Sequence, residues 1–231
     1  TGFREFFIRN YNQVTYSCFG KITNINIVKG HHQELYLKMY LDEATGKTLL
    51  LHHPDVEAAK AEARKNVQET LKLIDTLRQH GSDFLFVFAP TKPAVYPEYM
   101  PRRYQQLLSD FSLEEYYIEL FKENNIPHID FYNYFKTIKD KVAYPLYPRT
   151  GTHWSESTIP YVADSILKKL TEAAGYKLPS VNYLEENLTT DYSVQDGELE
   201  ASMNLLFPLN KPAIPRPIFE LTDTTNTDKP N

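Results

Sequence analysis

The chain opens with apolar side chains at helical spacing. They lie four, four, three and four residues apart, on one face of an α-helix predicted over about residues 3–19: Phe3, Phe7, Tyr11, Val14 and Cys18. We expect this face to be buried against the rest of the protein. Cys18 lies on it, so we interpret that residue as a small buried hydrophobe and not as a nucleophile.

A hairpin and a long helix are predicted next. Residues 25–28 alternate as a short strand, and a polar turn leads from them into a second strand at residues 35–37. A Pro-Asp pair then opens a helix over about residues 54–80, and a glycine ends it.

Apolar runs predict a sheet. Residues 83–89 are mostly apolar and are cut off by Pro90, which favours a central strand buried on both faces. After a helical region that ends near residue 124, a second strand is predicted over residues 126–131. Helices and strands therefore alternate, which predicts an α/β fold with a parallel sheet.

The last clear helix follows a His-Trp pair. Its apolar face is Ile159, Val162, Ile166 and Leu170, with Ser155 placed as its N-cap and Gly175 closing it. His153 precedes this helix in a loop, beside the only tryptophan, Trp154. Such loop positions often carry catalytic groups, but a packed aromatic pair that merely orders the loop fits the local sequence equally. Because ligands bind at the carboxyl ends of parallel strands, the Thr91–Lys92 loop and the His153 loop should face one pocket.

The pattern weakens beyond residue 175. We therefore predict an α/β domain with an N-terminal helix and hairpin over residues 1–175 and an irregular extension over residues 176–231. Within the extension, Leu199, Met203 and Leu206 suggest a short helix, and residues 211–217 are proline-rich. The polar residues 222–231 are expected to be disordered.

Composition narrows the classes of partner. The 231 residues are 42% hydrophobic and 24% charged, with a formal net charge of −5, so a nucleic-acid partner gains no electrostatic support. The single cysteine excludes an internal disulfide. Two His-His pairs, at residues 31–32 and 52–53, lack metal-ligand spacing, so no metal is expected. The sequence also contains no 18-residue apolar run that would indicate a membrane span.

Three segments carry a family resemblance: Phe3 to Asn12, Ala89-Pro90-Thr91-Lys92 with Tyr96-Pro97-Glu98, and Arg149-Thr150-Gly151-Thr152-His153-Trp154-Ser155. They resemble the entry helix, the Pro-Thr-Lys loop and the Asp-x-His-Trp signature of the alginate O-acetyltransferase (AlgX/AlgJ-like) branch of the SGNH hydrolase superfamily. The likeness covers most of residues 1–174. It implies a flavodoxin-like three-layer sandwich with a central parallel sheet, and no cofactor.

The resemblance also implies a site and its partners. His153 maps onto the family's catalytic histidine, which takes a proton from a serine or an acceptor hydroxyl. The implied substrate-binding residues are Lys92, Tyr96, Arg149, Thr152 and Trp154. The substrate would be a polysaccharide, acetylated or deacetylated in the periplasm or cell envelope. A membrane-bound acyltransferase that supplies acetyl groups is the implied protein partner.

Two departures from the family pattern matter. Gly151 stands where the family has its Asp, so a dyad or a carboxylate from elsewhere, such as Asp130, would have to replace it. Members of the family carry their nucleophile in a Gly-Asp-Ser turn, after a strand that follows the His-Trp segment. This sequence contains no Gly-Asp-Ser. On this comparison the sheet would be incomplete at its C-terminal end and the chain resembles an N-terminal portion of a longer protein. Ser155 and Ser157 are interpreted as helix-cap residues and not as replacement nucleophiles.

Three hypotheses follow. The first is that the parent protein is a polysaccharide O-acetyltransferase or acetylesterase, of which this chain alone would be inactive. The second is a catalytically degenerate module that binds glycan or docks an acyltransferase. The third is an α/β scaffold without a site, which requires His153 and Lys92 to lie far apart or to be buried.

Overall fold

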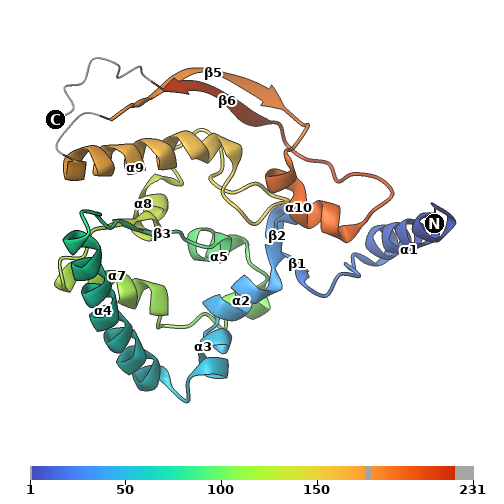
Figure 1. The fold of residues 1–231 in the computed structure, drawn as a ribbon. Helices are drawn as coiled ribbons and strands as arrows, with labels where there is room; N and C mark the ends of the chain where they lie inside the picture. The colour runs from blue at the N-terminus through green and yellow to red at the C-terminus, as the bar shows by residue number, and fades with distance from the viewer. Residues whose placement is uncertain (1, 175–177, 222–231) are drawn as a thin grey trace.

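A two-stranded hairpin and a peripheral helix begin the fold. The computed structural model describes residues 2–174 and 178–221. Helix α1 (Gly2–Phe19) lies at the edge of the molecule (Figure 1). Strands β1 (Ile27–Lys29) and β2 (Leu35–Leu37) pair antiparallel around the short 3-10 helix η1 (His31–Gln33). The hairpin predicted from the alternating sequence is therefore confirmed.

A parallel sheet forms the centre. Strands β3 (Phe86–Phe88) and β4 (His128–Asp130) are parallel neighbours, shorter than the apolar runs had suggested. Four helices surround them: α4 (Val56–Gln79), α7 (Leu113–Glu123), α8 (Phe131–Ile138) and α9 (Ile159–Ala174). The predicted α/β fold is confirmed, with this small sheet as its parallel element.

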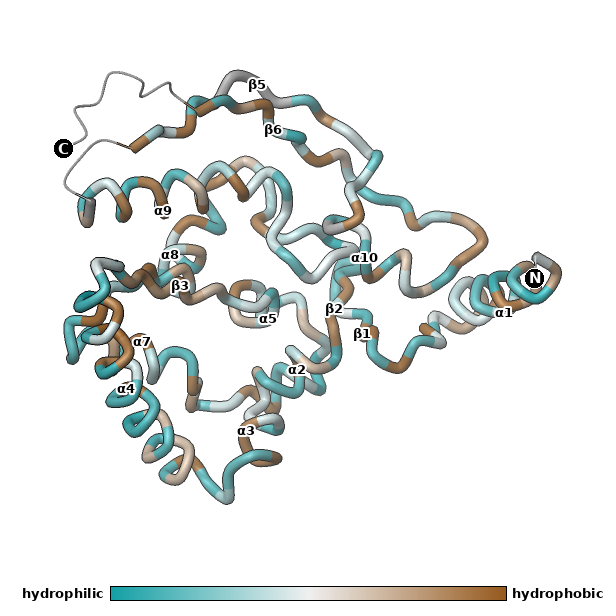
Figure 2. The backbone as a smooth tube through the Cα atoms, in the orientation of Figure 1, coloured by the Kyte–Doolittle hydropathy of each residue, from teal (hydrophilic) through white to brown (hydrophobic). Residues whose placement is uncertain are grey.

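The two faces of the sheet are covered by different helices, which makes three layers. Phe88 packs with Val67 of α4 and Ile118 of α7. On the opposite face, Val87 and Ile129 lie against a cluster built mainly from α8, α9 and the segment before residue 148. Figure 2 shows β3 as a hydrophobic stretch between these layers. Burial of aromatic and branched side chains on both faces stabilises the sheet.

The helices of this core begin where the sequence provides caps. Asp55 accepts a hydrogen bond from the backbone N of Ala58 at 2.8 Å, and Ser112 accepts one from Glu115 at 3.2 Å. These bonds satisfy backbone donors that the first helical turn leaves free. Short helices connect the layers: α2 (Lys38–Ala44), α3 (Lys47–His52), α5 (Lys92–Val95), η2 (Pro97–Tyr99), α6 (Arg102–Gln105) and η3 (Glu156–Thr158).

The C-terminal region contains regular elements where we had predicted an irregular extension. Strands β5 (Val181–Thr189) and β6 (Ile214–Leu221) form an antiparallel pair that lies along α9 (Figure 1). Helix α10 (Val194–Met203) confirms the predicted short helix, and its Leu199 and Met203 pack with β1 and β2. The domain boundary at residue 175 stays a prediction. Gly175 as a helix end and the tail at residues 222–231 lie outside the described residues.

Helix α1 turns its apolar face outward, so the prediction that this face is buried was wrong. Phe3 is 78% exposed and Tyr11 67%, and Cys18 is also exposed. The polar face packs inward instead, because Arg9 and Asn12 donate hydrogen bonds to the backbone carbonyls of residues 203–205. None of the described helices is both long enough and apolar enough to cross a bilayer.

Candidate active site

A cleft of about 360 Å³ opens at the carboxyl end of β3. The residues after β3 and the loop after Tyr147 both contribute to its wall, as expected from the order of the strands. Its lining is Tyr40, Ala89, Pro90, Thr91, Tyr147, Thr152, His153 and Trp154. The hydroxyl of Tyr147 donates to the carbonyl of Pro90, which ties the two loops together.

His153, which lines this cleft, has a carboxylate partner. Its Nδ1 lies 3.0 Å from Oε1 of Glu198, a residue of α10. The same oxygen accepts the backbone N–H of Thr152 at 2.7 Å and that of His153 at 3.3 Å. One carboxylate therefore fixes both the ring and the backbone that carries it.

The contact also assigns the two ring nitrogens. A carboxylate facing Nδ1 favours the tautomer that carries its proton there, and Nε2 is then the proton acceptor. In the part of the chain that the structure describes, Nε2 has no hydrogen-bond partner, and the His153 side chain is 65% exposed. The imidazole is thus oriented on one side and open to a ligand on the other, which is the arrangement that a general base requires.

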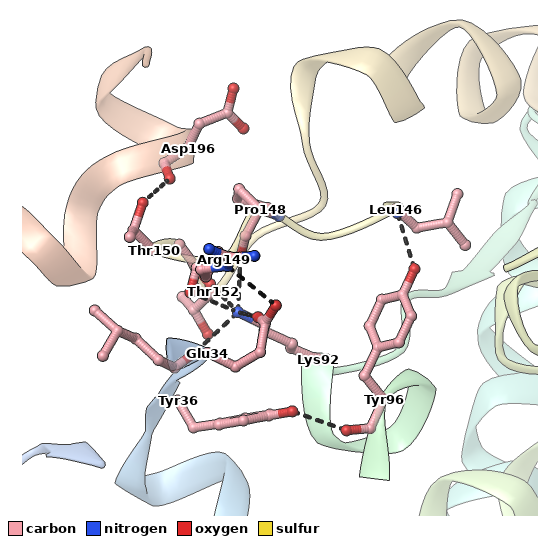
Figure 3. Close-up of polar contacts among 12 residues, drawn as sticks. Glu34, Tyr36, Lys92, Tyr96, Leu146, Pro148, Arg149, Thr150, Thr152 and Asp196 are labelled. Carbon is pink, nitrogen blue, oxygen red and sulfur yellow. Dashed lines mark hydrogen bonds and ion pairs between the residues drawn. The ribbon is translucent and has the colours of Figure 1, made fainter. Parts of the chain in front are cut away.

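The buried side chain of Lys92 anchors the loop that carries His153 (Figure 3). The Lys92 side chain is 1% exposed and its Nζ lies 2.8 Å from Oε2 of Glu34. The ammonium also donates to four backbone carbonyls at 2.7–3.1 Å, those of Leu35, Pro148, Arg149 and Gly151. Burial lowers the pKa of Lys92, and the Glu34 carboxylate acts in the opposite direction.

Helix α10 anchors the same loop from the other side. The hydroxyl of Thr150 donates to the carbonyl of Asp196 (Figure 3). The carbonyl of Thr150 accepts the N–H of Leu199 at 3.1 Å. Asp196 Oδ1 accepts the N–H of Glu156 at 3.3 Å. Burial, and then the charge of Glu156, raises the pKa of Asp196 to about 6. Helix α10 is therefore a structural support of the candidate site.

Comparison of the sequence with models of known families shows to which family the chain belongs. The family described as "SGNH hydrolase-like domain, acetyltransferase AlgX" matches residues 47–229, most of the chain. The chain belongs to this family.

Two solved structures share the fold of this AlgX-family chain. The O-acetyltransferase domain of Pseudomonas putida AlgJ aligns with a TM-score of 0.51 and 20% sequence identity, over 86% of this chain and 66% of that one. Pseudomonas aeruginosa AlgX aligns with a TM-score of 0.53 and 16% identity, over 86% of this chain and 44% of that one. The chain thus spans less than two thirds of the length of either structure. No match was found among curated protein sequences.

The carboxylate that faces His153 is not Asp130, the replacement suggested from the sequence. Asp130 caps α8 by accepting the N–H of Asn133 at 3.0 Å and pairs with Lys122 at 3.0 Å. Burial acts to raise the pKa of Asp130, but these hydrogen bonds outweigh it and lower the pKa. Glu198 makes the contact with the His153 ring instead. Sequence reasoning missed Glu198 because it lies 45 residues away, in a helix whose acidic residues resemble an ordinary solvated face.

The six residues predicted for the site divide into two groups. His153, Thr152 and Trp154 line the cleft. Lys92, Tyr96 and Arg149 lie behind it, in contact with other parts of the chain. All the hydrogen bonds and the ion pair described for Lys92 are to oxygens of the protein itself, so its geometry supports an anchoring role and gives no support to the expected substrate contact.

Tyr96 and Arg149 also have internal partners. The Tyr96 hydroxyl accepts the N–H of Leu146 at 3.0 Å, and the Tyr96 carbonyl accepts the hydroxyl of Tyr36 at 2.8 Å (Figure 3). Burial raises the pKa of Tyr96 to about 12. Arg149 Nε lies 3.9 Å from Glu34 Oε1, and the Arg149 carbonyl accepts the N–H of Leu35. Their roles in substrate binding stay predictions.

The serines beside the histidine are structural. Ser155 occupies the N-cap position before η3, but its hydroxyl makes no capping bond. It is 1% exposed and lies 2.7 Å from the hydroxyl of Ser157 and 3.1 Å from that of Thr158. A hydroxyl enclosed in this way is inaccessible to an acyl donor. Within residues 2–174 and 178–221, no three His, Cys, Asp or Glu side chains gather as metal ligands would.

Proposed function

We propose that the protein transfers acetyl groups to, or removes them from, hydroxyls of a polysaccharide, with His153 as general base. The observation that carries the proposal is the His153–Glu198 contact of 3.0 Å in a cleft at the carboxyl end of β3. Membership of the AlgX family supports the class of reaction. A ligand in the cleft would meet Nε2, the ring nitrogen that the carboxylate leaves free.

The roles of the two residues follow from acid–base chemistry. As an attacking hydroxyl forms its bond to the acetyl carbonyl carbon, Nε2 of His153 takes the hydroxyl proton. The proton is then returned to the leaving oxygen when its bond to that carbon breaks. Glu198 holds the ring in place and stabilises the imidazolium that forms between these steps.

The proposal assigns the base and its carboxylate to this chain, and not the nucleophile. In the serine mechanism that the family resemblance suggests, the first hydroxyl to attack is that of a Gly-Asp-Ser turn. This sequence contains no such segment. The family resemblance also supports a location in the periplasm or cell envelope, with a membrane-bound acyltransferase as acetyl donor.

The test is an acetyl-transfer assay on the full-length natural protein that contains these residues. Release of acetate from an acetyl ester and transfer to a polysaccharide are measured for wild type and for His153→Ala. We expect a loss of about 100-fold or more in kcat. His31→Ala is the control, because His31 is exposed and its side chain has no described contact. Unchanged turnover after His153→Ala would rule out the proposed base.

One observation favours a second function, that of a glycan-binding module without catalysis. None of the residues described as lining the cleft is a serine. If the full-length protein binds polysaccharide but turns over no acetyl ester, the binding module is the correct assignment.

A further inference from the structure

A second cavity, of about 390 Å³, adjoins the cleft and is used by no step proposed above. It lies among α2, α3, α5, α7 and α8. Its wall combines apolar and acidic side chains, among them Glu43, Leu49, Pro93, Leu113, Glu114 and Tyr132.

The cavity and the cleft share walls. Thr91 lines both, and α2 contributes Tyr40 to the cleft and Glu43 to the cavity. Residues three apart lie on the same helix face, so α2 forms one continuous side of the two hollows. A chain-like ligand at His153 could therefore extend into the second cavity.

The polar groups of the cavity are incompletely paired. Tyr132 is only 4% exposed, yet its hydroxyl has no hydrogen-bond partner among the described residues. Burial, and then the charge of Glu114, raises the pKa of Glu43 to about 7. Glu43 and Glu114 both line the cavity, and neither carboxylate has an ion-pair partner among the described residues. A hydroxyl without a hydrogen-bond partner and two carboxylates without an ion-pair partner, all lining one cavity, are groups that a ligand would satisfy.

No positively charged side chain that lines the cavity pairs with Glu43 or Glu114. The only ammonium among the lining residues is that of Lys136, which already pairs with Glu115. His53 faces Glu62 at 3.5 Å, and His52 is exposed. The cleft itself is lined by no Lys or Arg. A polymer of uronic acids would therefore bring its carboxylates against Glu43, Glu114 and Glu198, which is unfavourable.

We propose that the two hollows form one groove that binds an amine-bearing hexosamine polysaccharide, whose ammonium group lies between Glu43 and Glu114. The hydroxyl of Tyr132 bonds a neighbouring sugar oxygen, and a hydroxyl of the next sugar reaches His153. This names the acceptor class for the acetylation proposed above and rests on that proposal. Ammonium–carboxylate hydrogen bonds are the strong type, so the charge gives both affinity and selectivity.

The single tryptophan allows a direct binding test. Trp154 lines the cleft, so ligand binding in the groove should change its fluorescence. The 231-residue protein is titrated at pH 7 and low salt with oligomers of glucosamine, of N-acetylglucosamine and of a uronic acid. We expect the glucosamine oligomer to bind about tenfold more tightly than its N-acetylated form, and the uronate oligomer to bind more weakly than both.

Variants connect the preference to the acids. Glu43→Gln, and separately Glu114→Gln, should reduce the preference for the glucosamine oligomer to about twofold or less. Glu119→Gln is the matched control, since Glu119 lies exposed on the same helix as Glu114, and it should leave the preference unchanged. Thermal unfolding of each variant shows that it is folded.

The proposal is overturned if the uronate oligomer binds as tightly as the glucosamine oligomer, or if neither Glu43→Gln nor Glu114→Gln changes the preference. Because binding is measured without turnover, its outcome is separate from that of the catalytic assay. A retained preference together with unchanged turnover in His153→Ala would support the ligand class and reject the base.

Discussion

Glu198 Oε1 lies 3.0 Å from Nδ1 of His153, although the two residues are 45 positions apart. The family signature would supply this acid from position 151, which is glycine here. The carboxylate comes instead from α10, and it bonds the backbone of the histidine loop as well as the ring. An acid on a helix that is itself anchored to Thr150 can hold the imidazole in a fixed orientation, as the absent aspartate would.

Glu198→Gln should reduce acetyl transfer in the full-length protein. An amide keeps the side-chain shape but can no longer stabilise the imidazolium, so we expect kcat to fall by about 100-fold or more with a smaller change in KM. Kinetics of the variant and of Glu69→Gln, an exposed control on α4, provide the comparison. Wild-type kcat in Glu198→Gln would show that the contact has no catalytic role.

The parts of the fold that the sequence predicted are those determined by local patterns. Asp55 caps the long helix that the Pro-Asp pair was predicted to open, and the apolar runs before Pro90 and around Ile129 form the parallel strands. The position of His153 on the carboxyl edge followed from the same order of elements. These features depend on neighbours in sequence, so a single sequence contains them.

The features that were missed depend on distant neighbours. Nothing near Lys92 indicates that its ammonium will be enclosed by carbonyls of β2 and of residues 148–151. Glu198 is one of several acidic residues of α10, and nothing in the sequence indicates that this helix packs beside the His153 loop. In α1 the periodicity was correct, but the face that packs inward is decided by backbone carbonyls at residues 203–205, which accept from Arg9 and Asn12.

Lys92→Met should destabilise the protein strongly. The change takes the ion-pair partner at 2.8 Å from the largely buried Glu34 and removes a donor from four carbonyls, of which those of Pro148 and Arg149 keep a backbone N–H. We therefore expect the free energy of unfolding to fall by about 3–5 kcal/mol. Urea unfolding measures the loss. Lys72→Met, at an exposed i,i+3 pair on α4, should change stability by less than about 0.5 kcal/mol.

The double variant Lys92→Met/Glu34→Gln separates the ion pair from the carbonyl contacts. Removing the unpaired carboxylate should recover about 1–2 kcal/mol of the loss, with the remainder due to the carbonyls. If Lys92→Met alone unfolds like wild type, Lys92 does not anchor the loop, and its expected contact with substrate becomes the better assignment.

Helix α1 should tolerate polar substitution on its apolar face and resist change on its polar face. Val14→Ser removes an exposed side chain and should alter stability by less than about 0.5 kcal/mol. Asn12→Ala removes a buried amide that donates to the Met203 and Asn204 carbonyls and accepts from Thr23, so we expect a loss of about 1–3 kcal/mol. Thermal and urea unfolding of both variants give the comparison. A larger loss in Val14→Ser than in Asn12→Ala would mean that the apolar face packs against the protein.

Glu43 should make stability depend on pH. Its pKa is raised from 4.5 to about 7 by burial and by Glu114. Between these values the unfolded chain has released a proton that the folded protein retains, so the free energy of unfolding falls as the pH rises through this window.

Glu43→Gln removes the ionisable group and should remove this dependence. We expect the variant to be more stable than wild type at pH 8 by about 1–2 kcal/mol, after the shift is discounted for the solvent around a partly exposed group. At pH 4, where Glu43 is protonated in both states, the two proteins should have nearly equal stability. Urea unfolding at the two pH values measures both differences. The other charged or titratable side chains around the cavity, those of His52, His53, Glu114, Glu115 and Lys136, are the same in both proteins. A variant that is less stable than wild type at pH 8 would show that the Glu43 carboxylate has a compensating cation, and that the cavity lacks the uncompensated negative charge on which the hexosamine proposal rests.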